Sequence, residues 1–506
     1  MKHILCAKQG HLLTALVLAL ACGIAPYSRV VHGKGAGSPS SIAGRGDTAS
    51  PREMRSGTRG SGANKGGAHA PTGMGRDSQI YFAEGFTGQG PDVDFTEHLT
   101  ILNTNALTAT GQIDYYLTGD ISATTPITVP ITVPAHGQLI EDVGQDVGLD
   151  QTVSAVVQTD EVVAAARTIS RTTVAGVSLG ESITPGVDTL AQFWYFAEGY
   201  TGASFQEYLA LFNPGASPAT VTVEPVGGNG SQVSAPLTSV VPPHARITVN
   251  LRAAIPGRSI GMSVQSDQPI AAERVLYWGD GTGSAKFGTA VTGGIRGPAA
   301  LWTFPFVSTV GSDQAFLSFI DPTTVAAHVQ LTAFGPPGVG PMPRTVTVAA
   351  GARATVALPA QLEAMAIVAS SDVPVIAEEG QYFGGSPNMG AHMGSVVAGT
   401  PQPASQWAFP GISDPAFTDL TWYVFNRGSA AATVTVTVLG QGMAPAQTRI
   451  RADPGKLTVV NLASIRAMRG AAGSLWVSNS PVVITQVIRG ADPTVGAIVS
   501  GVPQTP

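Results

Sequence analysis

The sequence predicts an all-β protein in which four tandem immunoglobulin-like β-sandwich modules follow a signal peptide and a disordered linker. Three observations lead to this prediction. A similar aromatic opening occurs four times, and each copy contains stretches in which apolar and polar residues alternate. Turn-forming residues are abundant, with 61 glycines and 37 prolines against only 12% charged residues. Such a composition favours turn-rich β structure over long charged helices.

The N-terminus predicts export from the cytoplasm. Two basic residues, Lys2 and Lys8, precede an apolar run from Leu12 to Ala25. A basic start before such a run is typical of a secretory signal peptide, which we assign to residues 1–32. Cys22 follows small residues and also resembles a weak lipoprotein site, so a lipid anchor at Cys22 is the alternative to release. We expect a secreted or cell-surface protein.

Residues 33–78 are rich in Gly, Ser, Ala and Arg and almost lack large apolar side chains. Such a segment cannot offset the entropy lost on ordering, so we expect a disordered linker. Its charge to Gln79 is +4 and that of the signal region is +3, so the part after Gln79 carries −6 − 7, which is −13. A basic linker on an acidic body fits attachment to an anionic surface, although a solvated linker is the commoner case. We expect no nucleic-acid partner for the acidic body.

Cysteine use and hydropathy exclude several classes of protein. The only two cysteines, Cys6 and Cys22, lie in the signal region, so the mature chain has no disulfide and no cysteine-based metal site or nucleophile. After about residue 26 there is no apolar run of the roughly 18 residues that a spanning helix requires. The mature chain is therefore predicted to have no transmembrane span.

Repetition sets the domain organisation. Phe82, Phe196, Phe304 and Phe409 hold one position in the four openings and are 114, 108 and 105 residues apart. The predicted modules are residues 79–184, 185–297, 298–400 and 401–506. Each contains several short strands, with a turn expected between two late strands at Asp160, Asp267, Asp372 or Asn479. A period of about a hundred residues favours a sandwich over a propeller blade, which needs only about 40 to 50.

The second copy resembles a known group of proteins. It contains Trp-Tyr-Phe-Ala-Glu-Gly at 194–199, Asn-Pro at 213–214 and Ala-Glu-Arg at 272–274. These segments resemble those of uncharacterised secreted bacterial repeat proteins with a W-Y-F-A-E-G-x-T opening. The resemblance covers about residues 79–506 and is strong in the second copy only. It implies an extracellular immunoglobulin-like module and no known reaction.

Two positions change together between the copies. The first two copies have Glu84 and Glu198 in the opening, and Arg167 and Arg274 about 80 residues later. The third and fourth copies replace these residues by Phe306, Glu379, Gly411 and Gln486. We therefore predict ion pairs Glu84–Arg167 and Glu198–Arg274 that join the first strand to a late strand. The alternative is an acid catalyst, but a glutamate beside an arginine stays ionised and cannot donate a proton near neutral pH.

One group of acidic residues is a candidate metal site. Asp92, Asp94 and Glu97 follow each other closely in the first copy and offer oxygen ligands for Ca²⁺. Their spacing lacks the full calcium-loop pattern, so an exposed acidic turn is the favoured interpretation. We expect no other cofactor.

The tryptophans divide into two sets. Trp194, Trp302 and Trp407 recur at one repeat position, which predicts packing residues of the core. Trp278 and Trp422 break this pattern. If they are exposed beside polar groups, they are candidate platforms for stacking a sugar ring.

No catalytic motif stands out. The chain has no GxSxG or SxxK pattern, and its histidines lack the paired spacing of a zinc site. We therefore predict a non-enzymatic, exported cell-surface protein with a structural or adhesive role, whose partner is a cell-surface or extracellular polymer. The alternative is an array of polysaccharide-binding modules, with a glycosidase as its remoter form.

Overall fold

Alternation of buried and exposed residues produces strands throughout the part of the chain that the structure, a computed structural model, describes. In β12 (Ala219–Val226), for example, Val221 and Val223 are buried, whereas Thr220 and Glu224 are exposed. This period of two gives a strand one face toward a core and one toward solvent. Apart from two short helices, the described elements are strands, which confirms the all-β prediction.

The structure describes residues 78–89, 93–118, 125–176, 178–202, 204–228, 233–279, 287–335, 342–360, 364–384, 391–411, 417–440, 444–461, 472–490 and 496–504. The chain divides into two units, Met1–Pro71 and Thr72–Pro506, and all described residues belong to the second. The predicted signal peptide with Cys22, and all of the predicted linker except Ser78, lie outside the described residues.

Four sheets follow one another along the chain, and we call each with its strands a module. Module 1 contains β1 (Ser78–Phe82), β2 (Phe86–Gln89), β3 (Val93–Asn103), β4 (Ala109–Leu117), β5 (Ile127–Val133), β6 (Gly137–Asp142), α1 (Val143–Val147), β7 (Gln151–Thr159), β8 (Ala164–Thr173) and β9 (Ser178–Pro185). Module 2 contains β10 (Ala191–Phe196), β11 (Phe205–Asn213), β12, β13 (Leu237–Val241), β14 (Ala245–Asn250), α2 (Leu251–Ala254), β15 (Gly261–Trp278) and β16 (Gly288–Gly293).

The last two modules repeat this order without a described helix. Module 3 contains β17 (Ala299–Val307), β18 (Gln314–Ile320), β19 (Ala327–Phe334), β20 (Met342–Val348), β21 (Arg353–Ala357), β22 (Met365–Gly384) and β23 (Ala391–Ala398). Module 4 contains β24 (Ala404–Phe409), β25 (Phe417–Phe425), β26 (Ala432–Gly440), β27 (Ala446–Ala452), β28 (Leu457–Asn461), β29 (Ala472–Gly490), β30 (Gly496–Ser500) and β31 (Val502–Pro503).

One long strand joins the two halves of a module. In module 2 the first part of β15 pairs with β10 and β12, and its second part pairs with β11 and β16. β22 and β29 do the same in modules 3 and 4, whereas module 1 divides this strand into β7 and β8. In an immunoglobulin sandwich each strand belongs to one sheet. The shared long strand is therefore a distinct feature of this fold.

The turns expected at Asp267, Asp372 and Asn479 lie inside these continuous long strands, so the prediction is right only at Asp160, between β7 and β8. Their side chains serve a different purpose. The Oδ1 atoms of Asp160, Asp267, Asp372 and Asn479 accept hydrogen bonds from the backbone N–H groups of Thr110, Thr220, His328 and Thr433 at 2.7 to 2.9 Å. The repeated polar residue thus satisfies the start of a neighbouring strand in every module.

Each module has its own apolar core. Trp194, Trp302 and Trp407 are each no more than 2% exposed, which confirms them as packing residues. Their indole N–H groups also bond to the backbone. Trp194 Nε1, for instance, donates to the carbonyl oxygens of Ala191 and Ile270 at 3.2 and 3.1 Å. A buried indole that satisfies its donor in this way fixes the first strand against the long one.

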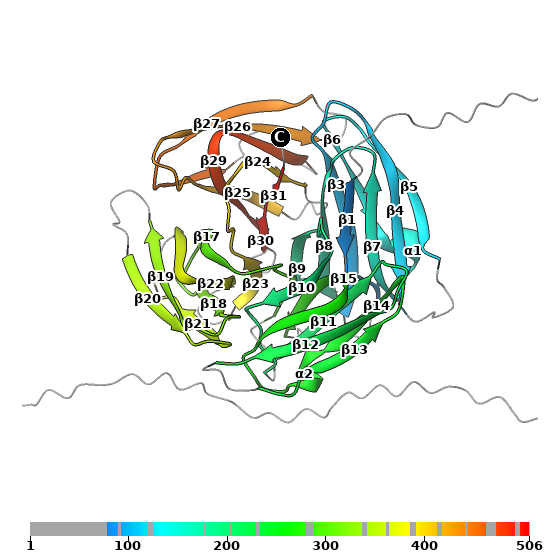
Figure 1. The fold of residues 1–506 in the computed structure, drawn as a ribbon. Coiled ribbons are helices and arrows are strands. Elements are labelled where there is room, and N and C mark those ends of the chain that lie inside the picture. Colours follow the sequence, from blue (N-terminus) through cyan, green and yellow to red (C-terminus); the bar gives the residue numbers. More distant parts are fainter. Residues whose placement is uncertain are drawn as a thin grey trace, which may run out of the picture. The chain divides into compact units, whose positions relative to one another are not determined.

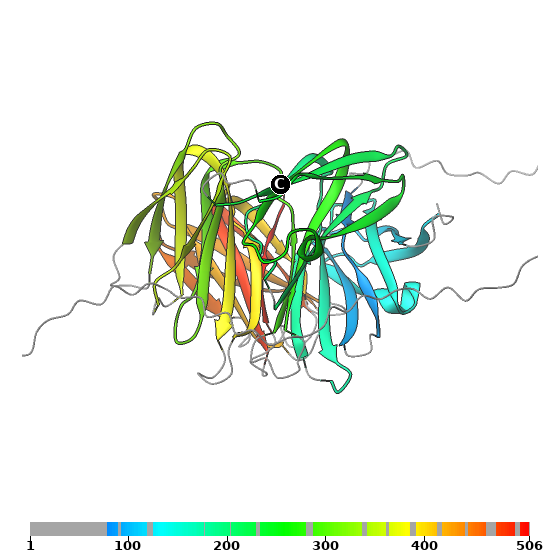
Figure 2. The same ribbon diagram turned by 90° about the horizontal axis from the view of Figure 1, so that it is seen from below.

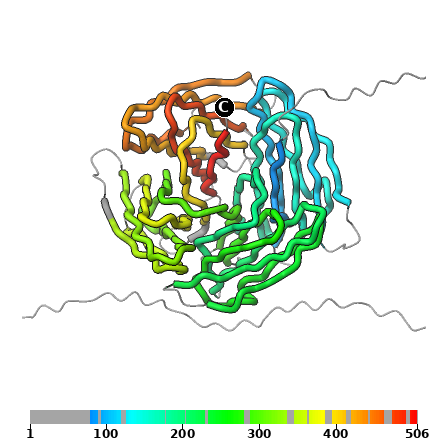
Figure 3. The backbone as a smooth tube through the Cα atoms, viewed as in Figure 1, coloured from blue at the N-terminus to red at the C-terminus, as the bar shows by residue number. Residues whose placement is uncertain are grey.

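The four modules of the second unit contact one another in a closed cycle. The last main strand of each module, β9, β16, β23 or β30, lies beside the corresponding strands of at least two other modules. Figure 1 shows β9, β23 and β30 on the inner side and β5, β13, β20 and β27 on the outer side. The chain passes through the modules in sequence order (Figure 3). Figure 2 shows the same unit from below, with module 3 on one side and modules 1 and 2 on the other.

The contact between modules 4 and 1 closes the cycle. Leu102 and Ala164 pack against Ala408 and Leu439, all fully or almost fully buried. A linear tandem array has no contact between its first and last members, so the four modules do not form an open row. The segment that leads from module 1 to module 2 contains the largely buried strand β9.

Candidate functional site

Buried charged residues gather where modules 1 and 2 meet. Glu84 follows β1, Arg167 lies in β8, and module 2 contributes Arg246 from β14 and Glu273 from β15. The Glu84 carboxylate lies 2.5 Å from Arg246 Nη2, and Arg167 Nη1 lies 2.9 Å from Glu273 Oε2. The backbone N–H of Glu84 donates to Glu273 Oε2 at 2.6 Å. All four side chains are at most 7% exposed.

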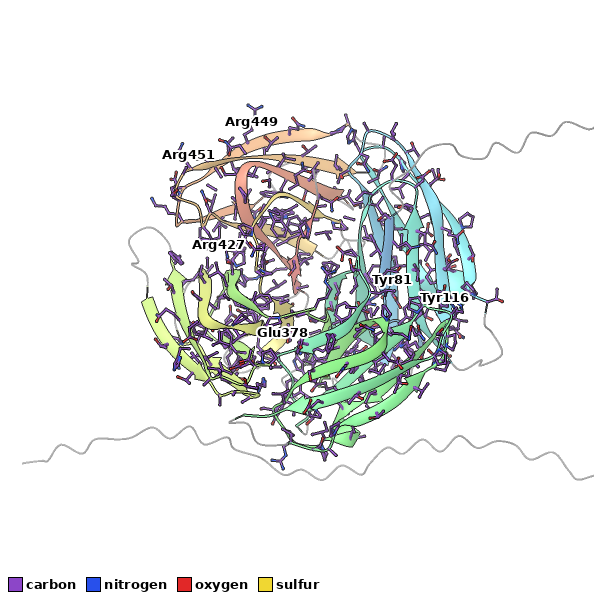
Figure 4. All side chains as sticks on the ribbon, in the orientation of Figure 1. Tyr81, Tyr116, Glu378, Arg427, Arg449 and Arg451 are labelled. Carbon is purple, nitrogen blue, oxygen red and sulfur yellow. The ribbon has the colours of Figure 1, made fainter. Side chains whose placement is uncertain are left out.

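The same arrangement recurs where modules 2 and 3 meet. Glu198 pairs with Arg353 at 2.8 Å, and Arg274 pairs with Glu378 at 3.1 Å. The backbone N–H of Glu198 donates to Glu378 Oε2 at 2.7 Å. Figure 4 labels Glu378 on the side of module 3 that faces module 2.

The predicted partners Glu84–Arg167 and Glu198–Arg274 are therefore wrong. The carboxylates pair with arginines of the following module, while Arg167 and Arg274 donate to the backbone carbonyl oxygens of Glu84 and Glu198. The two positions do lie side by side, which explains why they change together. The contact is made by the carbonyl, so the carboxylate is free to reach across the boundary.

Each cluster also contains a fifth ionisable side chain, a glutamate. Glu97 from β3 and Glu207 from β11 are 2% and 0% exposed. Among the described residues, Oε2 of Glu97 and both carboxyl oxygens of Glu207 have no hydrogen-bond partner. Burial raises the pKa of each carboxyl to about 8, although the nearby guanidinium groups of Arg167 and Arg274 act in the opposite direction. With this carboxyl protonated near neutral pH, two carboxylates balance two guanidinium groups in each cluster.

The glycine of the repeated opening follows from this close packing. A Cβ on Gly85 would lie 2.6 Å from the carbonyl oxygen of Val153 and 2.8 Å from both carboxyl oxygens of Glu97. Gly199 has the equivalent position, 2.6 Å from Glu207 Oε1. Only glycine lets the backbone come so close to the buried carboxyl. The Glu-Gly pair of the opening is thus part of the module boundary.

The other two boundaries are apolar or contain an amide. Between modules 3 and 4, Phe306 packs on Tyr423 with ring centroids 4.6 Å apart, in a cluster that includes Leu457. Between modules 4 and 1, Gln138 Oε1 accepts the backbone N–H of Gly411 at 3.0 Å. Glu379, at the position of Arg167, is buried and forms no ion pair with any described residue, and burial holds its pKa well above the usual value.

The candidate calcium ligands do not come together. Asp92 lies outside the described residues. Asp94 and Glu97 are three positions apart in β3, so their side chains point to opposite faces of the strand, and Glu97 belongs to the buried cluster. Within the described ranges, no three acidic, histidine or cysteine side chains form a group able to hold a metal ion.

Both candidate sugar platforms are buried, so the exposure on which that role depended is not met. Trp278 is 3% exposed, stacks on Phe205 with centroids 5.5 Å apart and contacts Tyr382 of module 3 at 5.6 Å. Trp422 is fully buried and lies 5.5 Å from Trp476. Both tryptophans pack inside or between modules, so neither ring is available to a ligand.

A central cavity of about 290 Å³ lies among the inner strands of the four modules. Its hydroxyl groups already hold neighbouring strands together. Thr184 Oγ1 donates to the carbonyl oxygen of Val291 at 2.7 Å, and Thr292 Oγ1 donates to that of Val396 at 2.5 Å. Their role is therefore to connect β9 to β16 and β16 to β23.

Two grooves lie at equivalent places, one where modules 3 and 4 meet and one where modules 2 and 3 meet. The groove between modules 3 and 4 has a volume of about 610 Å³, is mostly apolar and contains Arg427. Figure 4 labels Arg427 where these modules meet, and its Nη1 donates to Thr303 Oγ1 at 2.9 Å. The groove between modules 2 and 3 has a volume of about 430 Å³ and contains Phe193, Tyr195 and Glu224.

Sequence reasoning missed these last three residues. Phe193 and Tyr195 flank Trp194, whose packing position is repeated in this chain. Strand alternation places them on the opposite face, away from the core. Two aromatic residues on the strand face turned away from the core, the exposed Phe193 and the half-buried Tyr195, were the available signal. The second part of the groove comes from another module, which no local pattern indicates.

None of the helices in the described ranges has the length and apolar character that crossing a membrane requires. No curated protein has a sequence that matches this chain. The solved structure titled "Crystal Structure of Thermotoga maritima 1070" is 18% identical and has a TM-score of 0.18, over 21% of this chain and 95% of that chain. A family model of unknown function, DUF5719, matches residues 143–268 and 296–498. Because these two regions cover more than half of the sequence, the chain belongs to the DUF5719 family of unknown function.

Proposed function

We propose that this protein is a non-enzymatic, exported cell-surface protein with a structural or adhesive role. The observation that supports it best is the use of the buried charged residues. The paired glutamates and arginines lie at module boundaries, where each carboxylate is held by a guanidinium group of the neighbouring module. Such groups fix the modules against one another. A body built in this way suits a role that depends on a stable surface.

The absence of catalysis is part of the proposal. The carboxyls with raised pKa, Glu97 and Glu207, are 2% and 0% exposed, so no substrate reaches them without separation of the modules. A general acid must come within hydrogen-bond reach of the group that it protonates. These carboxyls therefore fit a structural role better than an acid–base role.

The test is the location of the protein on intact cells. We expect antibodies against the four-module unit to label unpermeabilised cells, and external protease to remove the label. A Cys22→Ala variant separates the two modes of export: release of that variant into the medium supports a lipid anchor, whereas unchanged behaviour supports cleavage without one. Recovery of the protein in the cytoplasm only would contradict the proposal.

Polysaccharide binding remains the second candidate function. The buried Trp278 and Trp422 give it no support. The groove between modules 2 and 3, with its exposed aromatic side chain Phe193, is the observation that favours it.

A further inference from the structure

One side of the groove between modules 2 and 3 is formed by strands β10, β15 and β12. Their side chains that point away from the core of module 2 form the floor of the groove. Strand register places Tyr195, Ser263 and Glu224 side by side in one row, and Phe193 and Gln265 in the next. Neighbouring strands are about 4.8 Å apart, so each row presents an aromatic ring beside polar groups.

The wall of the groove comes from module 3. Ile320 and Asp321 at the end of β18 face the floor across the module boundary. Asp321 is fully buried, and its Oδ2 has no hydrogen-bond partner among the described residues. In the other modules the equivalent residue is an asparagine, whose amide donates to backbone carbonyl oxygens. Module 3 is therefore the only one of the four modules with an acidic residue at this position.

Module 1 offers a comparison for the floor. At the positions equivalent to those of Glu224 and Gln265 it has Asp114 and Gln158, and Gln158 Nε2 donates to Asp114 Oδ2 at 2.8 Å. The polar groups of module 1 thus satisfy one another. The side chains of Glu224, Ser263 and Gln265 make no hydrogen bond to any described residue. In module 2 the same face therefore has unused donors and acceptors.

We propose that this groove binds one ring of a neutral, hydroxyl-rich glycan. Phe193 is 45% exposed, and an aromatic ring of this kind stacks on the apolar face of a sugar. Ser263, Gln265 and Glu224 supply hydrogen-bond partners for the hydroxyl groups at the edge of that sugar. A volume of about 430 Å³ is within the usual range of small-ligand sites.

The charge of the lining selects among glycans. The described residues that line the groove include Glu224 and Asp321 but no lysine, arginine or histidine. Carboxylates accept hydrogen bonds from hydroxyl groups and repel anions. The ligand is therefore neutral, in contrast to an acidic polymer. This inference goes beyond the structural role proposed above and does not depend on it.

The test is a binding panel of neutral and anionic oligosaccharides, followed by titration of the full-length chain with the neutral oligosaccharide that binds best. We expect binding to at least one neutral member of the panel. Phe193→Ala should weaken this binding about tenfold, because it removes the stacking ring. Glu224→Gln should weaken it by a smaller factor. Neither variant should change the thermal unfolding of the chain.

Val240→Ala is the matched control, because Val240 is an exposed residue of module 2, 57% accessible, that does not line the groove. This variant should bind like the unmodified chain. The proposal is overturned if no neutral oligosaccharide binds, if only anionic members of the panel bind, or if Phe193→Ala and Glu224→Gln bind as well as the control. Each of these results leaves the surface location untouched, so the two proposals fail separately.

Discussion

The boundary between modules 1 and 2 and the boundary between modules 3 and 4 occupy equivalent places but have opposite chemistry. At the first, Glu84 and Arg246 form a buried ion pair. At the second, Phe306 and Leu457 belong to one apolar cluster. A repeated position is therefore not bound to one residue type. The members of a charged boundary depend on one another, so the replacement of one favours the replacement of the others.

The coupled replacements have a physical cause. A buried charge without its partner costs several kcal/mol, whereas an apolar set of similar volume is often as stable as the ion pairs. A sequence that changes one member of the cluster is destabilised until the others change as well. The third copy shows an incomplete case, since Glu379 is buried there at the position that is an arginine in modules 1 and 2.

The largest effect is expected from breaking one buried ion pair. Glu273→Ala leaves Arg167 buried without its carboxylate, so the free energy of unfolding should fall by about 3 to 5 kcal/mol. Thr485→Ala changes the equivalent position at the boundary of modules 3 and 4 and should cost about 1 kcal/mol or less. Urea unfolding of both variants measures the difference. Equal losses would mean that the charged boundary needs no pairing.

A second prediction concerns pH. The folded pKa of Glu97 and Glu207 is about 8, above the ordinary value of 4.5, so folding takes up a proton between these two values. Stability should therefore be highest below pH 4.5 with respect to these groups, and should fall as pH rises toward 8. The slope is at most about 1.4 kcal/mol per pH unit for each group.

The control for pH is the removal of the titrating group itself. In Glu97→Gln the contribution of this carboxyl to the slope should disappear, and the variant should be more stable than the unmodified chain at pH 8. Unfolding curves at a series of pH values measure both effects. A slope that persists unchanged in the variant would assign the titration to another group.

A smaller effect is expected from the glycine of the opening. Gly85→Ala places a Cβ against Glu97 and the carbonyl of Val153, which should cost about 1 to 3 kcal/mol. Gly297 has no atom within 4 Å of an added Cβ, so Gly297→Ala should change stability by about 0.5 kcal/mol at most. Thermal unfolding of the pair tests whether the close approach at the charged boundary is required.

The smallest loss of stability is expected from a hydrogen bond inside a single module, and it should be the same in module 2 as in module 4. Asp267→Ala in module 2 and Asn479→Ala in module 4 each remove one hydrogen bond to a strand start. Each should cost about 0.5 to 1.5 kcal/mol, because the bond is local and independent of the neighbouring module. A much larger loss in module 2 would indicate that this bond also supports the charged boundary.

Much of the fold could be predicted from the sequence, because the repeat is visible in single residues. The recurring Trp194, Trp302 and Trp407 predict a packing position, and the structure places all three in cores. The joint loss of Glu84 and Arg167 in later copies predicts their proximity. These signals work because they act within one module, where spacing along the chain reports spacing in the fold.

The partners across boundaries could not be predicted in this way. Every module offers a copy of each position, so a pattern cannot say whether Glu84 meets an arginine of its own module or of the next one. The burial of Trp278 could not be predicted for the same reason, since Tyr382 of module 3 helps to cover it. For Glu97 a signal was present: its spacing of three from Asp94 in a strand places the two carboxyls on opposite faces.

The contact of Leu102 with Ala408 and Leu439 has a consequence for how such proteins gain or lose repeats. In a solenoid, one more unit can be inserted because each repeat meets only its neighbours in sequence. Here a fifth copy would have no place between the first and the last, and deletion of one copy would expose two faces that differ in chemistry. The number of copies is thus fixed by geometry, so variation in this chain is expected within the modules and not in their count.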